Sequence, residues 1–364
     1  MKSRLAIVCT LALFVLLDVR KPATAEPYLA VRSGLPCASC HLNPTGGGMR
    51  SAFGDTYAQT RLPQYAYDPA QDQLWLGQVN DFLRAGGDLR YDASYTDVPH
   101  QKRSDAFGIE DFRVFGAASF LQDRVTLYVD QRLAPGGALT REAYALLWSR
   151  ARQFYLKAGK MYLPFGLRLQ DDGAFVRQAS GINYTTPDNG VELGWQHGAW
   201  SAQLAASNGA CGGNETDQGK QATASLVYVR PRWRLGGSFS FNDAGSGKRQ
   251  QQALFAGVKT GPIAWLAEGD YLIDGGFSPR RKLWAGLIEA NWEFLRGNNL
   301  KLTAEYFDPD LDVAQDQQNR FSLVWEYTPI PFVQTRLGVR RYGGIPQNDL
   351  QNRKEAFLEL HGFF

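Results

Sequence analysis

Apolar side chains recur at every second position in short segments beyond residue 80, and this alternation is the feature that most constrains the fold. In the segment 284–294 the even positions are Trp, Gly, Ile, Ala, Trp and Phe, whereas Glu289 and Asn291 stand at odd positions. The same pattern recurs in three further segments: 112–120, 300–306 and 356–364. Because successive side chains of a strand point to opposite faces, each segment predicts a β-strand with one apolar face.

The connections between these segments alternate in length, which a soluble β-sandwich does not require. The long connections are 97–106, 134–140, 164–189, 208–219, 243–249, 274–279, 308–318 and 343–351. The tight connections between them are 122–123, 149–150, 198–199, 230–231, 261–262, 296–298 and 328–331. Outer-membrane barrels alternate short periplasmic turns with long extracellular loops, so we expect an all-β chain, a transmembrane antiparallel β-barrel of about 16 strands over residues 76–364. An even number of strands returns the chain to the periplasmic side, where it ends on Phe364 at a lipid-facing position.

Residues 1–25 have the three regions of a secretory signal peptide: a basic start, an apolar run, and Ala-Thr-Ala at 23–25. We therefore expect export and a place in the bacterial outer membrane, with lipid around the barrel. After residue 25, no apolar run reaches the roughly 20 residues that a spanning helix needs. The formal net charge of +3 gives no indication of nucleic-acid binding.

Residues 37–41, Cys-Ala-Ser-Cys-His, have the spacing of c-type haem attachment. Two thiols add to the vinyl groups of one haem, and the imidazole that follows takes one axial position on the iron. A disulfide would not need His41, a thioredoxin-like pair would need a βαβ context, and zinc would need two further ligands. Only Cys211 remains beyond the signal peptide. The motif predicts one covalent haem c held by Cys37, Cys40 and His41.

The segment 26–75 is too short to build a core around a haem without help from the rest of the chain. It is rich in residues that interrupt helices, with Pro27, Pro36, Pro44 and glycines at 46–48. We expect it to form a compact plug segment, similar to a monohaem cytochrome c, that the barrel covers.

Residues 28–41, Tyr-Leu-Ala-Val-Arg-Ser-Gly-Leu-Pro-Cys-Ala-Ser-Cys-His, and 50–54, Arg-Ser-Ala-Phe-Gly, resemble the N-terminal segment of the fused outer-membrane monohaem cytochrome-porins. This family includes the outer-membrane iron-oxidising cytochromes. The resemblance implies a haem segment before a porin-type barrel. The Pro-Thr pair at 44–45 and the triple glycine depart from the family pattern. Residues 158–166 resemble a strand-end motif of phosphate-selective porins, in which the loop that follows often folds inward.

The second axial position on the iron has two main candidates, His361 and Met49, and the alternative is an open position or another residue. His361 has the parity of a lumen-facing residue near the periplasmic end, and Met49 is close to His41 in sequence. His100 falls in an extracellular loop and His197 on the outer face or a turn, so both are less suitable. Arginines bind carboxylates well, and the candidates for the haem propionates are Arg32 and Arg50.

A redox group inside a barrel would give electrons a route through an insulating membrane. The sequence therefore predicts electron transfer between an extracellular donor or acceptor, such as ferrous iron, and a periplasmic carrier such as a c-type cytochrome. Acidic residues of one loop, Asp308, Asp310, Asp312 and Asp316, could concentrate cations near the mouth, or they could be ordinary solvated loop charges. The alternatives are a solute-diffusion porin with a haem-bearing plug or gate, and a soluble periplasmic haem enzyme. Whether the chain is an enzyme stays open, because no acid–base pair or nucleophile stands out.

Overall fold

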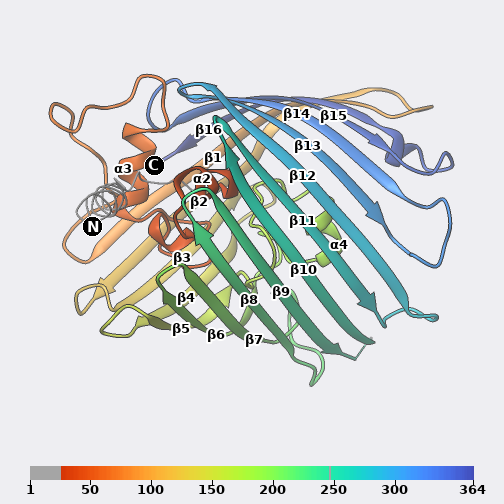
Figure 1. Ribbon diagram of the computed structural model, residues 1–364, viewed down its shortest axis with the longest axis horizontal. Helices are drawn as coiled ribbons and strands as arrows, with labels where there is room; N and C mark the ends of the chain where they lie inside the picture. The colour runs from red at the N-terminus through yellow and green to blue at the C-terminus, as the bar shows by residue number, and fades with distance from the viewer. Residues whose placement is uncertain (1–25, 246) are drawn as a thin grey trace, which may run out of the picture.

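The computed structural model describes residues 26–245 and 247–364, so the predicted signal peptide lies outside the described residues. Within them, sixteen strands form one closed barrel (Figure 1). The strands are β1 (Leu83–Asp97), β2 (Ser104–Phe120), β3 (Val125–Ala134), β4 (Leu139–Trp148), β5 (Phe154–Met161), β6 (Asp188–His197), β7 (Trp200–Ser207), β8 (Gln221–Arg230), β9 (Trp233–Ala244), β10 (Gly247–Thr260), β11 (Ile263–Asp274), β12 (Arg281–Leu295), β13 (Asn298–Asp308), β14 (Gln318–Tyr327), β15 (Val333–Gly343) and β16 (Lys354–Phe363).

Every strand pairs antiparallel with its neighbours in the chain, and β1 pairs with β16 to close the sheet. The closing register runs from Asp88 opposite Phe363 to Asp97 opposite Lys354. The predicted all-β barrel is confirmed, and tight turns gather at the end where β16 finishes (Figure 1). The connection expected at 243–249 was wrong in length, because β9 continues to Ala244 and β10 begins at Gly247.

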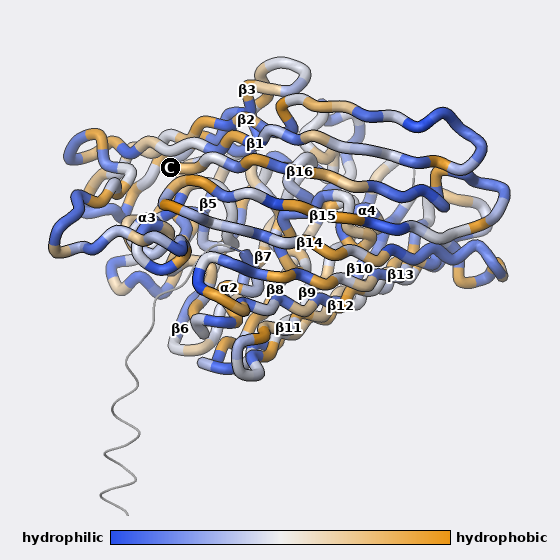
Figure 2. Tube along the Cα trace, turned by 90° about the horizontal axis from the view of Figure 1, so that it is seen from above, coloured by the Kyte–Doolittle hydropathy of each residue, from blue (hydrophilic) through white to orange (hydrophobic). Residues whose placement is uncertain are grey.

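The two faces of each strand differ as the alternation predicted. On β12, Ile288 is 60% exposed on the outer face, whereas Glu289 and Asn291 are buried toward the lumen. Figure 2 shows hydrophobic and hydrophilic residues alternating along the strands of the barrel. On β2 a bulge at Glu110 shifts this parity, so Phe107 and Ile109 face outward although their numbers are odd.

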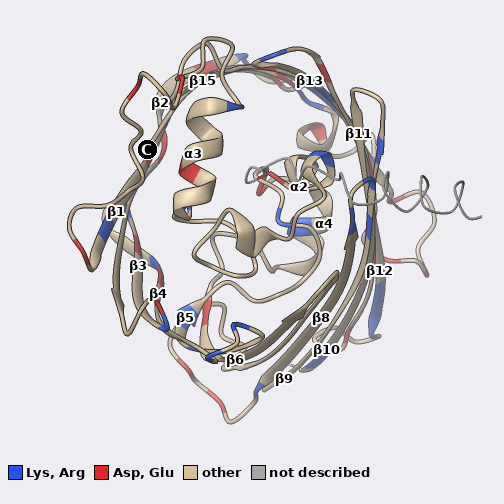
Figure 3. Cartoon of the chain, turned by 60° about the vertical axis from the view of Figure 1, so that its left-hand side comes forward, with Lys and Arg blue, Asp and Glu red and all other residues tan. Residues whose placement is uncertain are grey.

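The N-terminal segment, residues 26–82, enters the barrel from the tight-turn end (Figures 1 and 3). It contains the helix α2 (Pro27–Ser33), the 3-10 turn η1 (Cys37–Ser39) and the helix α3 (Ala52–Thr60). Helix α2 ends at Gly34, which has φ +66° and lies so close to Pro231 that a Cβ would meet its Cα at 2.5 Å. This segment is therefore seated directly beside the β8–β9 turn.

The connection between β5 and β6 also lies inside the barrel and carries the helix α4 (Phe175–Ser180) (Figure 3). Its backbone reaches across to opposite strands, because Leu167 N donates to Glu268 at 2.9 Å and Phe175 N donates to Glu305 at 2.7 Å. A second 3-10 turn, η2 (Asp349–Asn352), lies in the β15–β16 loop. In the described part of the chain, no helix is both long and apolar enough to cross a membrane.

Candidate functional site

The three residues of the haem motif project from a single turn. The backbone amides of Cys40 and His41 both donate to the carbonyl oxygen of Cys37, each at 3.1 Å. Cys37 is half-buried, whereas Cys40 and His41 are 2% and 5% exposed. The turn thus brings two thiols and one imidazole together inside the barrel.

The triple glycine that follows the motif is required by close contacts on three sides. A Cβ on Gly46 would lie 3.3 Å from Cys37 Cβ, one on Gly47 would lie 2.9 Å from the Tyr184 ring, and one on Gly48 would lie 2.3 Å from the Tyr128 hydroxyl. All three glycines have positive φ, at +95°, +79° and +63°. The loop can therefore fold back over Cys37 only with glycine at these positions.

A close contact also requires glycine at position 54, in the Phe-Gly pair at 53–54. A Cβ on Gly54 would meet the carbonyl oxygen of Cys40 at 2.2 Å, so α3 packs directly on the haem motif. Ser51 caps this helix, because its hydroxyl accepts from Gly54 N at 3.1 Å and donates to Ser39 O at 2.8 Å. The backbone of His41 also pairs with that of Arg50 in an antiparallel bridge.

Polar side chains of the barrel wall hold this loop in place. Asn43 donates from its amide nitrogen to Glu142 at 3.0 Å, and its amide oxygen accepts from Lys157 Nζ at 3.3 Å. The backbone amide of Met49 donates to the Tyr128 hydroxyl at 3.0 Å. Glu142 and Lys157 are fully buried, so the amide of Asn43 satisfies two charged groups that have little access to water.

The helix α2 is anchored on the other side of the lumen. Tyr28 donates its hydroxyl proton to Glu326 at 3.0 Å, and Lys301 pairs with Glu26 at 2.9 Å. Arg32 pairs with Glu293 and donates to the Asn299 side chain at 2.9 Å. The N-terminal segment is therefore fixed to β12, β13 and β14 as well as to β3, β4 and β5.

Two cavities meet at His41. A crevice of about 70 Å³ is lined by Cys37, Cys40 and His41 on one side and by side chains of β7, β8 and β9 on the other. A larger cavity of about 600 Å³ is also lined by His41. This larger cavity follows the inner face of β1, where its lining residues are Asp88, Arg90, Asp92, Ser94 and Thr96. Since β1 runs toward the loop end, the cavity connects the haem motif with the side of the long loops.

The two candidates for the second axial ligand occupy different surroundings. His361 is 6% exposed and lines the same cavity as His41. Its Nε2 lies 3.0 Å from Asp88 Oδ2, and its Nδ1 lies 3.4 Å from Gln334 Oε1. Met49 is 3% exposed, belongs to a cluster with Phe115 and Tyr128, and does not line the cavity.

The other two histidines lie away from the motif, as expected. His100 is in the β1–β2 loop, where its ring nitrogen lies 3.2 Å from Asp349. His197 ends β6 on the exposed side, with its ring 6.2 Å from that of Trp195. The structure therefore brings only His361 of the predicted histidines to the cavity that His41 lines.

Of the two arginines proposed for the haem propionates, only Arg50 lines the large cavity, where its guanidinium lies 4.4 Å from the Phe363 ring centroid. Arg32 lines neither cavity and is already bound to Glu293. Sequence reasoning missed Arg168, which lines both cavities and donates to Thr45 Oγ1 at 2.8 Å. The sequence feature that could have indicated Arg168 is the motif at 158–166, because the loop that follows this motif is expected to fold inward.

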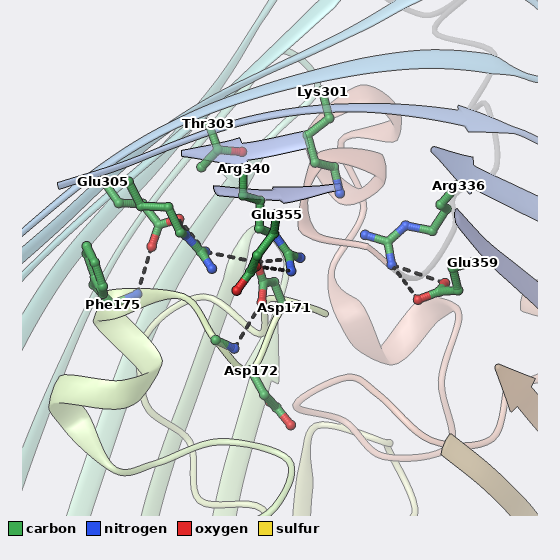
Figure 4. A network of polar contacts seen from close by, with 12 residues as sticks. Asp171, Asp172, Phe175, Lys301, Thr303, Glu305, Arg336, Arg340, Glu355 and Glu359 are labelled. Carbon is green, nitrogen blue, oxygen red and sulfur yellow. Dashed lines mark hydrogen bonds and ion pairs between the residues drawn. The ribbon is translucent and has the colours of Figure 1, made fainter. Parts of the chain in front are cut away.

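A network of charges fixes that inward loop against the far wall (Figure 4). Asp171 accepts from Arg320 at 2.9 Å and from Arg340 at 3.2 Å. Burial tends to raise the pKa of Asp171, but Arg340 and Arg320 outweigh it and hold this pKa below its ordinary value. Arg336 binds Glu359 nearby at 3.1 Å. The loop and the wall thus line this part of the cavity with charged side chains.

The acidic loop predicted to concentrate cations is partly neutralised by neighbouring side chains. Asp310 lies 3.8 Å from Arg281, and Asp312 lies 3.4 Å from Lys282. Within residues 26–245 and 247–364, no group of three His, Cys, Asp or Glu side chains is arranged to hold a metal ion.

The barrel is similar in fold to porins of known structure. OmpT of Vibrio cholerae, an outer membrane protein in its trimer form, matches with a TM-score of 0.62 and 11% identity over 78% of this chain and 99% of that chain. The anion-selective porin from Comamonas acidovorans matches with a TM-score of 0.60 and 8% identity over 78% and 99%. OmpF of Salmonella typhi, in complex with daunomycin, matches with a TM-score of 0.60 and 12% identity over 78% and 97%.

In sequence, no family model and no curated protein matches the chain. At these identities the structural likeness shows the fold alone. Together with the apolar outer face, it places the chain among porin-like β-barrels of the bacterial outer membrane.

The substitution Asn43→Ala tests how the N-terminal segment is held. It removes a hydrogen-bond partner from buried Glu142 and from buried Lys157, which should lower the free energy of unfolding by about 1–3 kcal/mol. We expect hydrogen exchange at the amides of residues 40–50 to become about tenfold faster or more, with unchanged exchange in β10–β13. Asn214→Ala, in an exposed loop, is the matched control. Equal protection in the two variants would show that Asn43 does not anchor the segment.

Proposed function

We propose that the chain is an outer-membrane electron-transfer protein with one c-type haem on Cys37, Cys40 and His41. In this proposal, electrons pass between a small extracellular donor or acceptor, such as ferrous iron, and a periplasmic carrier such as a c-type cytochrome. The observation that supports it best is the position of the motif, inside the barrel at the end of a cavity that extends toward the loops.

The residues around the motif fit a haem. Of the three motif residues, His41 lines the cavity of about 600 Å³, which is within the range of cofactor pockets, and Cys37 and Cys40 line the smaller crevice that His41 also lines. Apolar side chains line part of the larger cavity near the motif: Leu29, Ala58, Leu62, Phe115 and Phe363. Arg50 and Arg168 are the basic residues best placed for propionate groups, because both line this cavity. Bound there, the haem would supply reversible one-electron chemistry at its iron.

His361 is the second axial ligand that we propose. It shares the cavity with His41, and Asp88 at its Nε2 would fix the ring orientation and the tautomer that leaves Nδ1 as the acceptor. To act as a ligand, Nδ1 must give up its long contact with Gln334. Met49 is less suitable because its side chain packs against the wall instead.

The cavity also explains how an external donor would reach a site close to the periplasmic end. Its walls carry both signs of charge, including Arg90, Asp92, Arg340 and Glu355, so they favour water and small ions. A dissolved ion can approach through such a passage, whereas a large particle cannot enter. One redox centre is then enough for electrons to cross the membrane, because the donor covers part of the distance by diffusion through the cavity.

A solute-diffusion porin with a haem-bearing plug is the alternative, and the same polar cavity favours it. The two functions differ in what the haem segment does. In a porin, single-channel conductance should be substantial and should persist in a variant without haem. In an electron-transfer protein, the reduction of the haem by an external donor is the activity itself.

The first test is an absorption spectrum of the detergent-extracted protein, produced with c-type maturation. We expect a haem band that stays with the denatured protein and that becomes reduced when dissolved ferrous iron is added. The variant Cys37→Ser with Cys40→Ser should form the barrel without this band. A parent protein without covalent haem would overturn the proposal, and a covalent haem that ignores iron would exclude iron as the donor.

The second axial ligand is tested by His361→Ala and Met49→Leu. Loss of a strong imidazole ligand should convert the haem from low spin to high spin, so we expect this change in His361→Ala and not in Met49→Leu. Electron paramagnetic resonance of the oxidised protein measures the spin state. A low-spin haem in His361→Ala would contradict the assignment of His361. A high-spin haem in Met49→Leu would identify Met49 as the second ligand instead.

A further inference from the structure

The tight-turn end of the barrel carries arginines that are not balanced by nearby carboxylates. We define the turn-end arginines as Arg124, Arg150, Arg152, Arg230 and Arg232. All are exposed except Arg124, which is half-buried. Among the described residues, none of these five guanidinium groups forms an ion pair with a carboxylate within 4.0 Å. This end of the barrel is seen in Figure 3.

At the loop end of the barrel several basic side chains have acidic partners, whereas exposed Lys102 and Arg280 have none within 4.0 Å in the described part of the chain. Examples of the pairs are Lys220 with Glu215 at 3.0 Å, Lys248 with Asp243 at 3.1 Å and Lys282 with Asp312 at 3.4 Å. The five turn-end arginines form no ion pair with a described carboxylate, so they leave a positive field at this part of the rim.

These arginines occupy the sector of the rim from the β2–β3 turn through the β4–β5 turn to the β8–β9 turn. Arg296, in the β12–β13 turn outside this sector, is also exposed and has no ion pair among the described residues. The β2–β3 and β4–β5 turns are joined, because Arg152 donates to the carbonyl oxygen of Gln122 at 3.0 Å. Asp123 and Asp81 are acidic residues of this sector, since Asp81 precedes Phe82, whose carbonyl oxygen accepts from Ser119 N at 2.8 Å beside the β2–β3 turn. Other exposed acids of the N-terminal segment, such as Asp68, lie in the stretch 61–72, which is bonded to the opposite sector through Gln64 N and Thr328 O.

The basic sector is next to the haem motif. Gly34, three residues before Cys37, touches the β8–β9 turn so closely that a Cβ there would meet the carbonyl oxygen of Arg230 at 3.1 Å. The crevice that Cys37 and Cys40 line is also lined by Val229 and Arg234, the residues on either side of this turn. A protein seated on Arg230 and Arg232 would thus lie beside the cysteines.

We propose that the turn-end arginines form the docking surface for a soluble, acidic electron-carrier protein of the periplasm. This inference rests on the proposed function and adds the charge and position of the partner. One electron passes from the reduced haem of the barrel to the oxidised haem of the carrier, and no bond or proton moves with it. A positive surface raises the encounter rate with an acidic partner and orients it, and salt weakens both effects.

The test uses the haem-loaded protein in neutral detergent and a soluble acidic monohaem cytochrome as the probe. Stopped-flow absorbance gives the second-order rate of electron transfer to the oxidised probe. Surface plasmon resonance gives binding of the probe to the same samples. The variant is Arg230→Gln with Arg232→Gln. The matched control is Lys102→Gln with Arg280→Gln, which removes two exposed positive charges from the loop end.

We expect the rate and the binding of the Arg230/Arg232 variant to fall about fivefold or more at low ionic strength, and the control to stay within about twofold of the parent. The difference should vanish at about 1 M salt, where the Debye length is only about 3 Å. Equal rates in variant and control would overturn the docking surface. So would an effect that appears only in nanodiscs of anionic phospholipid, because the arginines would then bind headgroups.

The outcomes separate this inference from the proposed function. A parent protein that holds haem and passes electrons to the probe equally well with and without Arg230 and Arg232 contradicts only the docking surface. A parent protein that binds the probe but carries no haem contradicts the electron-transfer function.

Discussion

Every backbone amide and carbonyl inside a bilayer must find a hydrogen-bond partner within the protein, because lipid offers none. The pairing of β1 with β16 meets this requirement by leaving no free edge among the described strands. Closure then divides each strand into an outer face for lipid and an inner face that can be polar. The buried charges of the lumen, such as Glu142 and Lys157, are possible only because this inner face is shielded from hydrocarbon.

That polar lumen determines how a second, smaller structure can be held inside it. The N-terminal segment has too few residues for its own core, so it uses hydrogen bonds to the wall, through Asn43 and Tyr28, and close contacts that require glycine at 46–48 and at 54. The proposed electron transfer depends on the two sides of the N-terminal segment, one facing the loops and the other facing the periplasmic turns. A polar cavity leads from His41 toward the loops, and the β8–β9 turn lies beside the cysteines at the other end.

The number of strands could be predicted from sequence because strand periodicity and turn residues are local signals. The bulge at Glu110 and the extension of β9 to Ala244 could not, since both depend on pairing with neighbouring strands. The haem motif is also local, and the parity of β16 was enough to point His361 into the lumen. Arg168 was missed because it approaches the motif only through the folding of a loop more than a hundred residues later in the chain.

The most direct test of the account is transmembrane electron transfer in sealed vesicles that contain the haem-loaded barrel and an entrapped oxidised cytochrome. Dissolved ferrous iron is added outside, and the absorbance of the entrapped cytochrome is followed. The account predicts reduction of the entrapped protein with the parent barrel and none with the variant Cys37→Ser with Cys40→Ser. Equal reduction with both barrels would mean that iron simply diffuses through the lumen, and it would contradict electron transfer through the N-terminal segment.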